Sequence, residues 1–233
     1  MSTLWDIQSR LKDLGFYHGR VDNIPGPLTD EAVSEFKRSV GLRPRPYIGP
    51  LTLRALFGGK PEIKFDAPWV NELGRYLNFH EVRNYKALYA WLRSDGSTLG
   101  DPRKFPWCGD AIHTAIRLTL PHEPFPGKVG KNPYLARNWL DFGEECGMLF
   151  GAIVVLWRGS IAGTSGHVAT LIGQDRSLGR LRVRGGNQSN AITDTWVDSS
   201  RVLGFRRPVT YGETLPLCPE MDSTGKFIST NEA

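Results

Sequence analysis

Cysteine is scarce in this chain of 233 residues, which contains only Cys108, Cys146 and Cys218. Their odd number, their wide spacing and the lack of a CxxC pair exclude a disulfide framework and a zinc ribbon. A few unpaired thiols are typical of a protein that is made in a reducing compartment.

Long apolar runs are also missing. No stretch of about 18 apolar residues is present, so we expect no stable insertion into a membrane. Residues 1–6 have neither the basic region nor the apolar core of a secretory signal. The sequence therefore predicts synthesis in a cytoplasm, without a signal peptide.

Two further absences concern ligands. The chain has no HxH or HExxH pair, and we expect neither a metal nor a cofactor. Its net charge of +5 favours an anionic partner. The densest basic group, within residues 176–184, has no interleaved aromatic side chains, which argues against nucleic acid as that partner.

The first sixty residues predict three short helices. Apolar residues recur at helical spacing over residues 4–14, and Gly15 ends this helix. Thr29 is a suitable N-cap for a second helix, because its side chain can accept from a free backbone N–H group. A third helix is expected at residues 51–57. This pattern predicts a small three-helix domain.

A family resemblance accompanies these helices. The residues that carry it are Gln8, Leu11, Leu14-Gly15-Phe16-Tyr17, Gly19, Asp22, Gly26-Pro27-Leu28-Thr29, Ala32, Phe36, Gly41-Leu42 and Ile48-Gly49-Pro50-Leu51-Thr52. On them the segment resembles the peptidoglycan-binding domain of bacterial and phage cell-wall hydrolases. The resemblance implies that residues 1–58 bind peptidoglycan, although Asp22-Asn23 departs from the usual Asp-Gly. Residues 59–66, with glycine, proline and charge, are expected to be a linker.

Cys108 stands at the start of a predicted helix. Irregular sequence precedes it, and residues 111–118 then show apolar side chains at helical spacing. A helix start lowers the pKa of a thiol and favours the nucleophilic thiolate, which makes Cys108 the candidate nucleophile. Cys146 and Cys218 lack such a setting and are predicted to be inert.

A sheet is expected after this helix. The segments that predict antiparallel strands are 151–157, 166–172, 180–184, 191–197 and 202–205. His167 starts the second of these strands, and Asn187 and Gln188 follow the third. A thiol on a helix, an imidazole on a strand and an amide on the next strand are what a papain-type site needs. Adjacent strand residues face opposite sides, so only one of the two amides can orient the imidazole.

A second resemblance covers residues 67–208. The motifs that carry it are Asp101, Pro106-Trp107-Cys108-Gly109, Ala136-Arg137-Asn138-Trp139-Leu140, Gly151-Ala152-Ile153-Val154-Val155, Gly166-His167-Val168, Gly185-Gly186-Asn187-Gln188-Ser189 and Val202-Leu203-Gly204-Phe205-Arg206-Arg207-Pro208. With these the segment resembles the cysteine peptidase domain of the NlpC/P60 and CHAP peptidoglycan hydrolases. The resemblance implies an α+β protein, with a papain-like helix-plus-antiparallel-sheet domain at residues 67–211.

The same resemblance implies roles for individual residues. Cys108 would be the nucleophile, His167 the base and Asn187 the orienting residue, with Gln188 as the rival for the third role and otherwise a substrate-binding residue. Trp107 and Asp110 are expected to line the cleft.

The resulting prediction is a monomeric, cysteine-type peptidoglycan endopeptidase or N-acetylmuramoyl-L-alanine amidase, of the kind that phages use for lysis. Such an enzyme would be made in a host cytoplasm and act on the cell wall. A non-catalytic wall-binding scaffold and a cysteine transferase remain alternatives. His113 is expected to be a structural or surface histidine, and residues 212–233 a loosely held tail.

Overall fold

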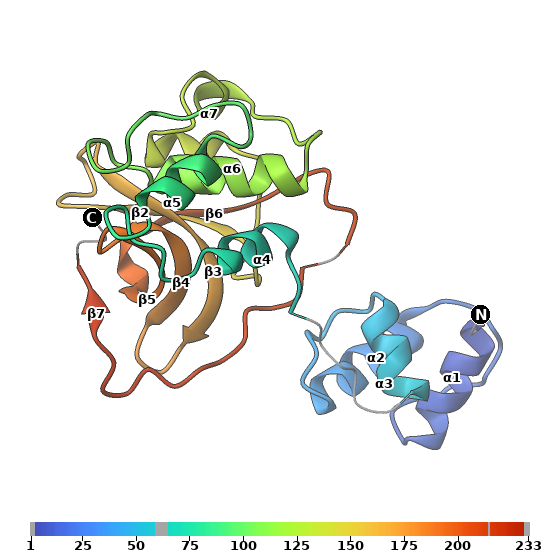
Figure 1. The fold of residues 1–233 in the computed structure, drawn as a ribbon. Coiled ribbons are helices and arrows are strands. Elements are labelled where there is room, and N and C mark those ends of the chain that lie inside the picture. The colour runs from blue at the N-terminus through green and yellow to red at the C-terminus, as the bar shows by residue number, and fades with distance from the viewer. Residues whose placement is uncertain (1–2, 59–64, 214, 231–233) are drawn as a thin grey trace. The chain divides into compact units, whose positions relative to one another are not determined.

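The computed structural model describes residues 3–58, 65–213 and 215–230. The chain divides into two compact units, Met1–Lys64 and Phe65–Ala233 (Figure 1). Residues 59–64 of the expected linker lie outside the described residues.

The smaller unit consists of three helices, α1 (Leu4–Asp13), α2 (Pro27–Ser39) and α3 (Pro50–Phe57). Thr3 caps α1 through a capping box with Asp6, which satisfies two backbone N–H groups at the helix start. The side chains that form the core are Ile7, Leu11, Tyr17, Ala32, Val33, Phe36 and Leu56.

Thr29 does not cap α2, as the sequence had suggested. The helix begins three residues earlier than expected, at Pro27 with Gly26 as its N-cap, because proline at the first helical position needs no N–H partner. The Thr29 hydroxyl instead accepts a hydrogen bond from Nε2 of the fully buried Gln8, at 3.1 Å. Gln8 also accepts from the backbone N–H groups of Asp22 and Asn23. The side chain of Gln8 therefore connects α1 to the loop at residues 22–23 and to α2.

The larger unit combines helices with one seven-stranded sheet, so the protein is of the α+β class. Its helices are α4 (Pro68–Arg75), α5 (Tyr85–Leu92), α6 (Cys108–Thr119), α7 (Gly127–Lys131) and the short 3-10 helices η1 (Ala136–Asp141) and η2 (Ser199–Arg201). Its strands are β1 (Glu144–Glu145), β2 (Ile153–Trp157), β3 (Gly166–Asp175), β4 (Arg180–Gln188), β5 (Ala191–Asp198), β6 (Val202–Arg207) and β7 (Ile228–Ser229). They lie in the order β1-β6-β2-β3-β4-β5-β7, and all pairs are antiparallel except β5 with β7.

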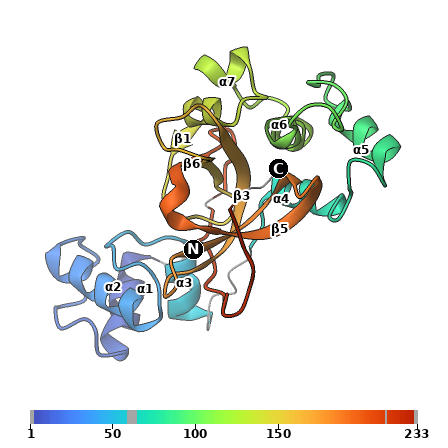
Figure 2. The ribbon, with the colours of Figure 1, turned by 90° about the vertical axis from the view of Figure 1, so that its left-hand side faces the viewer.

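Helix α6 lies against one face of the sheet, over β3 and β4 (Figure 2). Ala111, Ile112, Ala115 and Ile116 of α6 are fully buried on this face. They recur at helical spacing, so the same stripe that predicts the helix also attaches it to the sheet.

Residues 212–233 do not form a loose tail over their described part, contrary to the prediction. Leu215 and Cys218 are each 4% exposed, and β7 adds a parallel strand beside β5. Cys218 packs in a second core on the other face of the sheet, together with Val154 of β2 and Leu171 of β3. Because β2 and β3 carry apolar side chains on both faces, the second face also needs a cover, and the C-terminal segment supplies part of it.

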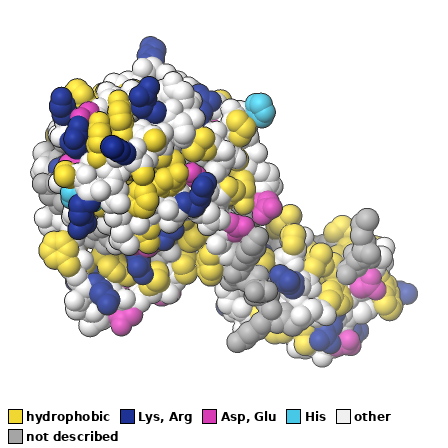
Figure 3. All heavy atoms as spheres, viewed as in Figure 1, with side chains coloured by type: hydrophobic (Ala, Val, Ile, Leu, Met, Phe, Trp, Pro, Cys, Tyr) yellow, Lys and Arg dark blue, Asp and Glu magenta, His cyan; other side chains and the backbone are white. Residues whose placement is uncertain are grey.

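Basic side chains are scattered among apolar ones on the face of the larger unit shown in Figure 3. Within the basic group expected near residues 176–184, Arg184 forms a two-point ion pair with Asp194, at 2.7 and 2.9 Å. This acid offsets part of the local charge. None of the helices in the described part of the chain is long and apolar enough to cross a bilayer.

Candidate active site around Cys108

Cys108 is the first residue of α6, as expected, and Trp107 occupies the N-cap position. The next residue has to be glycine. A Cβ atom on Gly109 would clash with the carbonyl oxygen of Pro133 and would lie 2.8 Å from that of Tyr134. The absence of a side chain therefore lets the segment at 133–134 pass close beside the start of α6, next to the thiol.

His167 lies near the start of β3, where it is paired with Leu156 of β2. Its side chain is directed to the thiol, and the two groups form a hydrogen bond. Burial by itself raises the pKa of the Cys108 thiol, but the hydrogen bond and the charge of His167 lower it, as do the backbone N–H groups of Val168 and Gly109. The net result is a pKa below that of an ordinary cysteine. The helix and the strand together thus favour a thiolate.

The amide that meets the imidazole belongs to Gln188. His167 Nε2 and Gln188 Oε1 are 3.1 Å apart, and both residues are buried. Asn187, the first expectation for this role, is instead in the left-handed backbone region with a φ of 57°. The reason is a bulge. Between the pairs Gly185–Thr193 and Gln188–Ala191, strand β4 has two residues where β5 has one.

Thr193 determines which way the Gln188 amide points. Gln188 Nε2 donates to the backbone oxygen of Thr193 at 2.5 Å and to its hydroxyl at 3.1 Å. A carbonyl oxygen can only accept, so the NH2 group must face Thr193 and the amide oxygen must face the ring. His167 therefore donates from Nε2, and its Nδ1 is left as the acceptor for the proton of the thiol.

Trp107 and Asp110 do not line an open cleft, contrary to the prediction. Trp107 is 1% exposed, and its Nε1 donates to Glu81 Oε2 at 2.9 Å. Asp110 is fully buried and accepts from the Thr98 hydroxyl and the Leu99 backbone N–H. Both side chains extend from the start of α6 into the interior, where they attach neighbouring loops to it.

Asp110 is an unusual buried acid. Its second carboxylate oxygen, Oδ1, has no hydrogen-bond partner among the described residues. Burial raises the pKa of Asp110 to about 6, despite the two donors on Oδ2. His113, one turn further along α6, is also buried and pairs through Nδ1 with Asp95 at 2.8 Å. Its role is structural, which agrees with the prediction that it does not face the thiol.

The other two cysteines differ from Cys108 in their surroundings. Burial raises the pKa of Cys146 to about 11 and that of Cys218 to about 12. Neither thiol begins a helix. Among the three thiols, only Cys108 has a pKa that its surroundings lower.

Arg137 belongs to the motif at residues 136–140, and the sequence predicted no role for it. Its guanidinium donates to three backbone oxygens of the β2–β3 loop, those of Ser160, Ile161 and Ser165, at 2.8 to 2.9 Å. This loop leads directly into His167. The fixed fork of five N–H donors makes arginine suited to holding such a loop.

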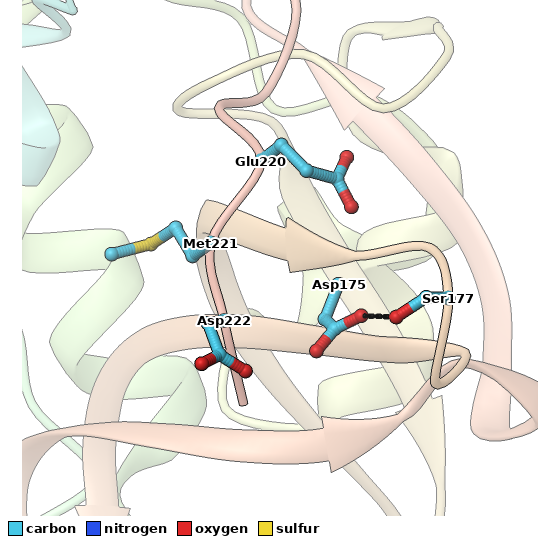
Figure 4. Close-up of a pocket in the computed structure, with 5 residues that line it drawn as sticks. All are labelled: Asp175, Ser177, Glu220, Met221 and Asp222. Atoms are coloured by element: carbon cyan, nitrogen blue, oxygen red, sulfur yellow. Dashed lines mark hydrogen bonds between the residues drawn. The ribbon is translucent and has the colours of Figure 1, made fainter. Parts of the chain in front are cut away.

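A separate surface pocket lies at the end of β3 and is lined by Asp175, Ser177, Glu220, Met221 and Asp222 (Figure 4). Asp175 accepts from Ser177 Oγ at 2.6 Å and from the N–H and hydroxyl of Ser223. These bonds hold its pKa far below the usual range and attach the C-terminal segment to the sheet. Within the described residues, no group of three or more His, Cys, Asp or Glu side chains could hold a metal ion.

Comparison with known proteins agrees with part of this interpretation. Residues 5–56 match the family model of a peptidoglycan binding domain. The chain is also similar to N-acetylmuramoyl-L-alanine amidase CwlM of Mycobacterium tuberculosis, with 42% identity over 79 residues. That match covers 31% of this chain and 20% of the relative, so the chain spans about a fifth of that protein. No solved structure matches the chain significantly. The chain thus carries a peptidoglycan-binding domain at its N-terminus and shares a similar segment of 79 residues with one protein named as an amidase.

Proposed function

We propose that residues 65–230 hydrolyse an amide bond of peptidoglycan, with Cys108 as nucleophile, His167 as base and Gln188 as the residue that orients the imidazole. The observation that carries the proposal is the lowered pKa of Cys108 beside a histidine whose other nitrogen is bonded to a buried amide. The N-terminal family match supports peptidoglycan as the substrate, because that family is described as peptidoglycan-binding. A papain-like arrangement is part of this proposal.

The chemistry follows from the order of these groups. His167 Nδ1 takes the proton of the thiol, and the Cys108 sulfur attacks the carbonyl carbon of the scissile amide. The tetrahedral intermediate collapses as the imidazolium gives its proton to the leaving nitrogen, which departs as an amine. A thioester remains. Water then attacks it while Nδ1 accepts the proton of the water, and release of the acid returns the proton to the sulfur.

The N–H groups of Gly109 and Val168, from the helix and from the strand, bond to Cys108 and stabilise its thiolate. The backbone N–H of Cys108, at the start of α6, would help to stabilise the oxyanion. A donor fixed at a helix start needs no rearrangement when negative charge develops on the substrate.

Replacement of the nucleophile tests this proposal. We expect Cys108→Ala to lower the rate of release of soluble fragments from purified sacculi by about 10⁴-fold, since members of such a group act as a unit. Binding to sacculi should persist, because the small domain is unchanged. Cys146→Ala, which removes a thiol with a raised pKa, is the matched control and should retain full activity. Degradation of sacculi by the Cys108→Ala variant at the wild-type rate would refute the assignment.

Mass spectrometry of the released fragments identifies the bond. A new amino terminus with a free lactyl group on the sugar indicates cleavage between glycan and peptide, as the name of the amidase relative suggests. A new terminus within the peptide indicates an endopeptidase. Either result is compatible with the proposed chemistry.

A non-catalytic wall-binding protein is the second candidate. The family match is confined to the small domain, and Cys108 is only 6% exposed. Labelling with iodoacetamide separates the two functions. Fast alkylation at neutral pH at Cys108, and not at Cys146 or Cys218, supports the hydrolase. Equally slow alkylation of all three thiols supports the binding protein.

A further inference from the structure

A second surface pocket of the larger unit has a basic lining. Residues 82–87 and Arg103 line an open depression of about 500 Å3 at the start of α5. Arg83 and Lys86 are exposed, and neither has a hydrogen-bond or ion-pair partner in the described part of the chain. Two cations without acidic partners that line the same pocket are suited to an anionic group.

One wall of the pocket is held in place by stacking. The guanidinium carbon of Arg103 lies 3.7 Å from the centre of the Tyr85 ring, and Tyr85 stacks in turn on Tyr89. Asp101 holds Arg103 from the other side with two hydrogen bonds, at 3.0 and 2.7 Å. Because the charge of Arg103 is already paired, Arg83 and Lys86 are the cations available to a ligand.

The start of α5 adds to this preference. Asn84 is its N-cap residue but makes no side-chain hydrogen bond to the helix, and the first turn of α5 contains no acidic residue. The positive end of the helix dipole lies in the pocket lining and favours a negative charge.

The pocket lies close to the candidate nucleophile along the chain. Arg103 precedes Cys108 by five residues, and five residues span at most about 18 Å. Glu81, next to the pocket residue Val82, accepts the hydrogen bond from Trp107, which precedes Cys108. An extended peptide of about five residues would cover even this upper bound of about 18 Å.

We propose that this pocket binds the free C-terminal carboxylate of the peptidoglycan stem peptide whose amide bond is presented to Cys108. The inference rests on the proposed function and adds a specificity site to it. Arg83 and Lys86 bind the carboxylate, and the exposed Val82 side chain in the same lining provides an apolar contact for the adjoining part of the peptide.

The test is a binding measurement on full-length protein that carries Cys108→Ala, so that no probe is consumed. The probes are a synthetic stem tetrapeptide with a free C-terminal carboxylate and the same peptide with a C-terminal amide. The test variant is Arg83→Gln with Lys86→Gln. The control is Lys128→Gln with Lys131→Gln, which removes two exposed charges from α7, on the other side of α6 from α5 in Figure 2.

We expect the test variant to bind the free acid about tenfold more weakly, since exposed charge pairs contribute modestly. Its affinity for the amide should be unchanged, and the control should bind both probes like the parent protein. Equal affinity of the parent for acid and amide would overturn the proposal, as would an equal loss in the control. Displacement of the acid by inorganic phosphate at lower concentration than by acetate would also overturn it, in favour of a phosphate site.

This binding result does not depend on turnover. If the wild-type protein fails to hydrolyse sacculi but the acid binds through Arg83 and Lys86, the proposed function fails and the pocket stands. If hydrolysis depends on Cys108 but the test variant binds and cleaves normally, only the pocket assignment fails.

Discussion

At the level of single side chains, the contact between His167 and Gln188 is the most informative feature of the candidate site. It determines which imidazole nitrogen can take a proton from Cys108, and Thr193 determines the direction of the amide. The neighbouring Asn187 has the same functional group but a different backbone conformation. Chemical type alone therefore does not distinguish the two residues.

Substitution of Gln188 and of Asn187 should show which of the two amides orients the imidazole. Gln188→Ala leaves the buried His167 ring without its acceptor, and we expect kcat to fall by about 10²- to 10⁴-fold as the imidazole loses its orientation. Asn187→Gly, which retains access to a positive φ, should keep at least a third of wild-type activity. Rates are measured on purified sacculi. The assignment is wrong if Asn187→Gly is the more damaging change.

Asp110 predicts a pH-dependent stability. Its pKa is about 6 in the folded protein, against 3.8 for an ordinary aspartate, so the folded state binds the proton more tightly than the unfolded chain does. The stabilising contribution is therefore complete below about pH 4 and is lost as the pH rises through 6, with a total of about 3 kcal/mol. The Asp110→Asn variant has no ionisable group at this position, so its stability does not fall in this way as the pH rises.

Urea unfolding between pH 4 and pH 7.5 measures this effect, with the buried Trp69, Trp107 and Trp139 as fluorescent reporters of the larger unit. We expect Asp110→Asn to gain stability relative to the wild type as the pH rises. A difference in unfolding free energy that is the same at each pH does not affect the test, because the cost of burying an unpaired amide at position 110 does not depend on pH. A constant difference across this range would contradict a raised pKa.

At the level of helices and strands, the site depends on how closely α6 approaches β4. Gly186 permits this approach, because a Cβ atom there would lie 2.5 Å from Ala111 Cβ and 2.6 Å from the Trp107 ring. Packing between the helix and the sheet thus explains Gly186, whereas a Cβ atom on Gly185 would lie 2.9 Å from Ala169 of the neighbouring strand β3. The same packing brings the sulfur of α6 to the imidazole of β3.

Gly186→Ala should displace the start of α6 from the sheet. We expect it to destabilise the larger unit by about 1–3 kcal/mol, as overpacking does, and to reduce activity more than stability alone explains. Gly147→Ala is the control, since a Cβ atom there meets nothing within 4 Å. Thermal unfolding and sacculus digestion are measured for both variants. Full activity of Gly186→Ala would show that the approach of α6 is not critical.

At the level of the whole chain, the C-terminal segment is part of the larger unit. It covers apolar side chains on the second face of the sheet and is bonded to it through Asp175 and Ser223, and through Arg201 and Ser229. A tail that carries proline, serine and acidic residues can therefore still be structural.

Truncation after Tyr211 should expose the second face of the sheet. We expect a lower melting temperature for the larger unit and a tendency to aggregate, because β5 becomes an edge strand and apolar residues are uncovered. Deletion of residues 1–58 is the comparison. It should abolish binding to sacculi but leave the melting of the larger unit unchanged, because the two units are separately compact. Equal melting of the truncated and full-length proteins would contradict the structural role of the segment.

Local patterns in the chain were enough to predict the class of the fold, the helix start at Cys108 and the strand start at His167. These features follow from apolar periodicity, which is set by neighbours along the chain. The choice of Gln188 over Asn187, the burial of Trp107 and Asp110, and the packing of the C-terminal segment came only from the assembled protein. They depend on the bulge in β4, on the contact between His167 of β3 and Gln188 of β4, and on the C-terminal segment that covers the second face of the sheet. Each of these arises from contacts between segments that are distant in sequence, which no local pattern records.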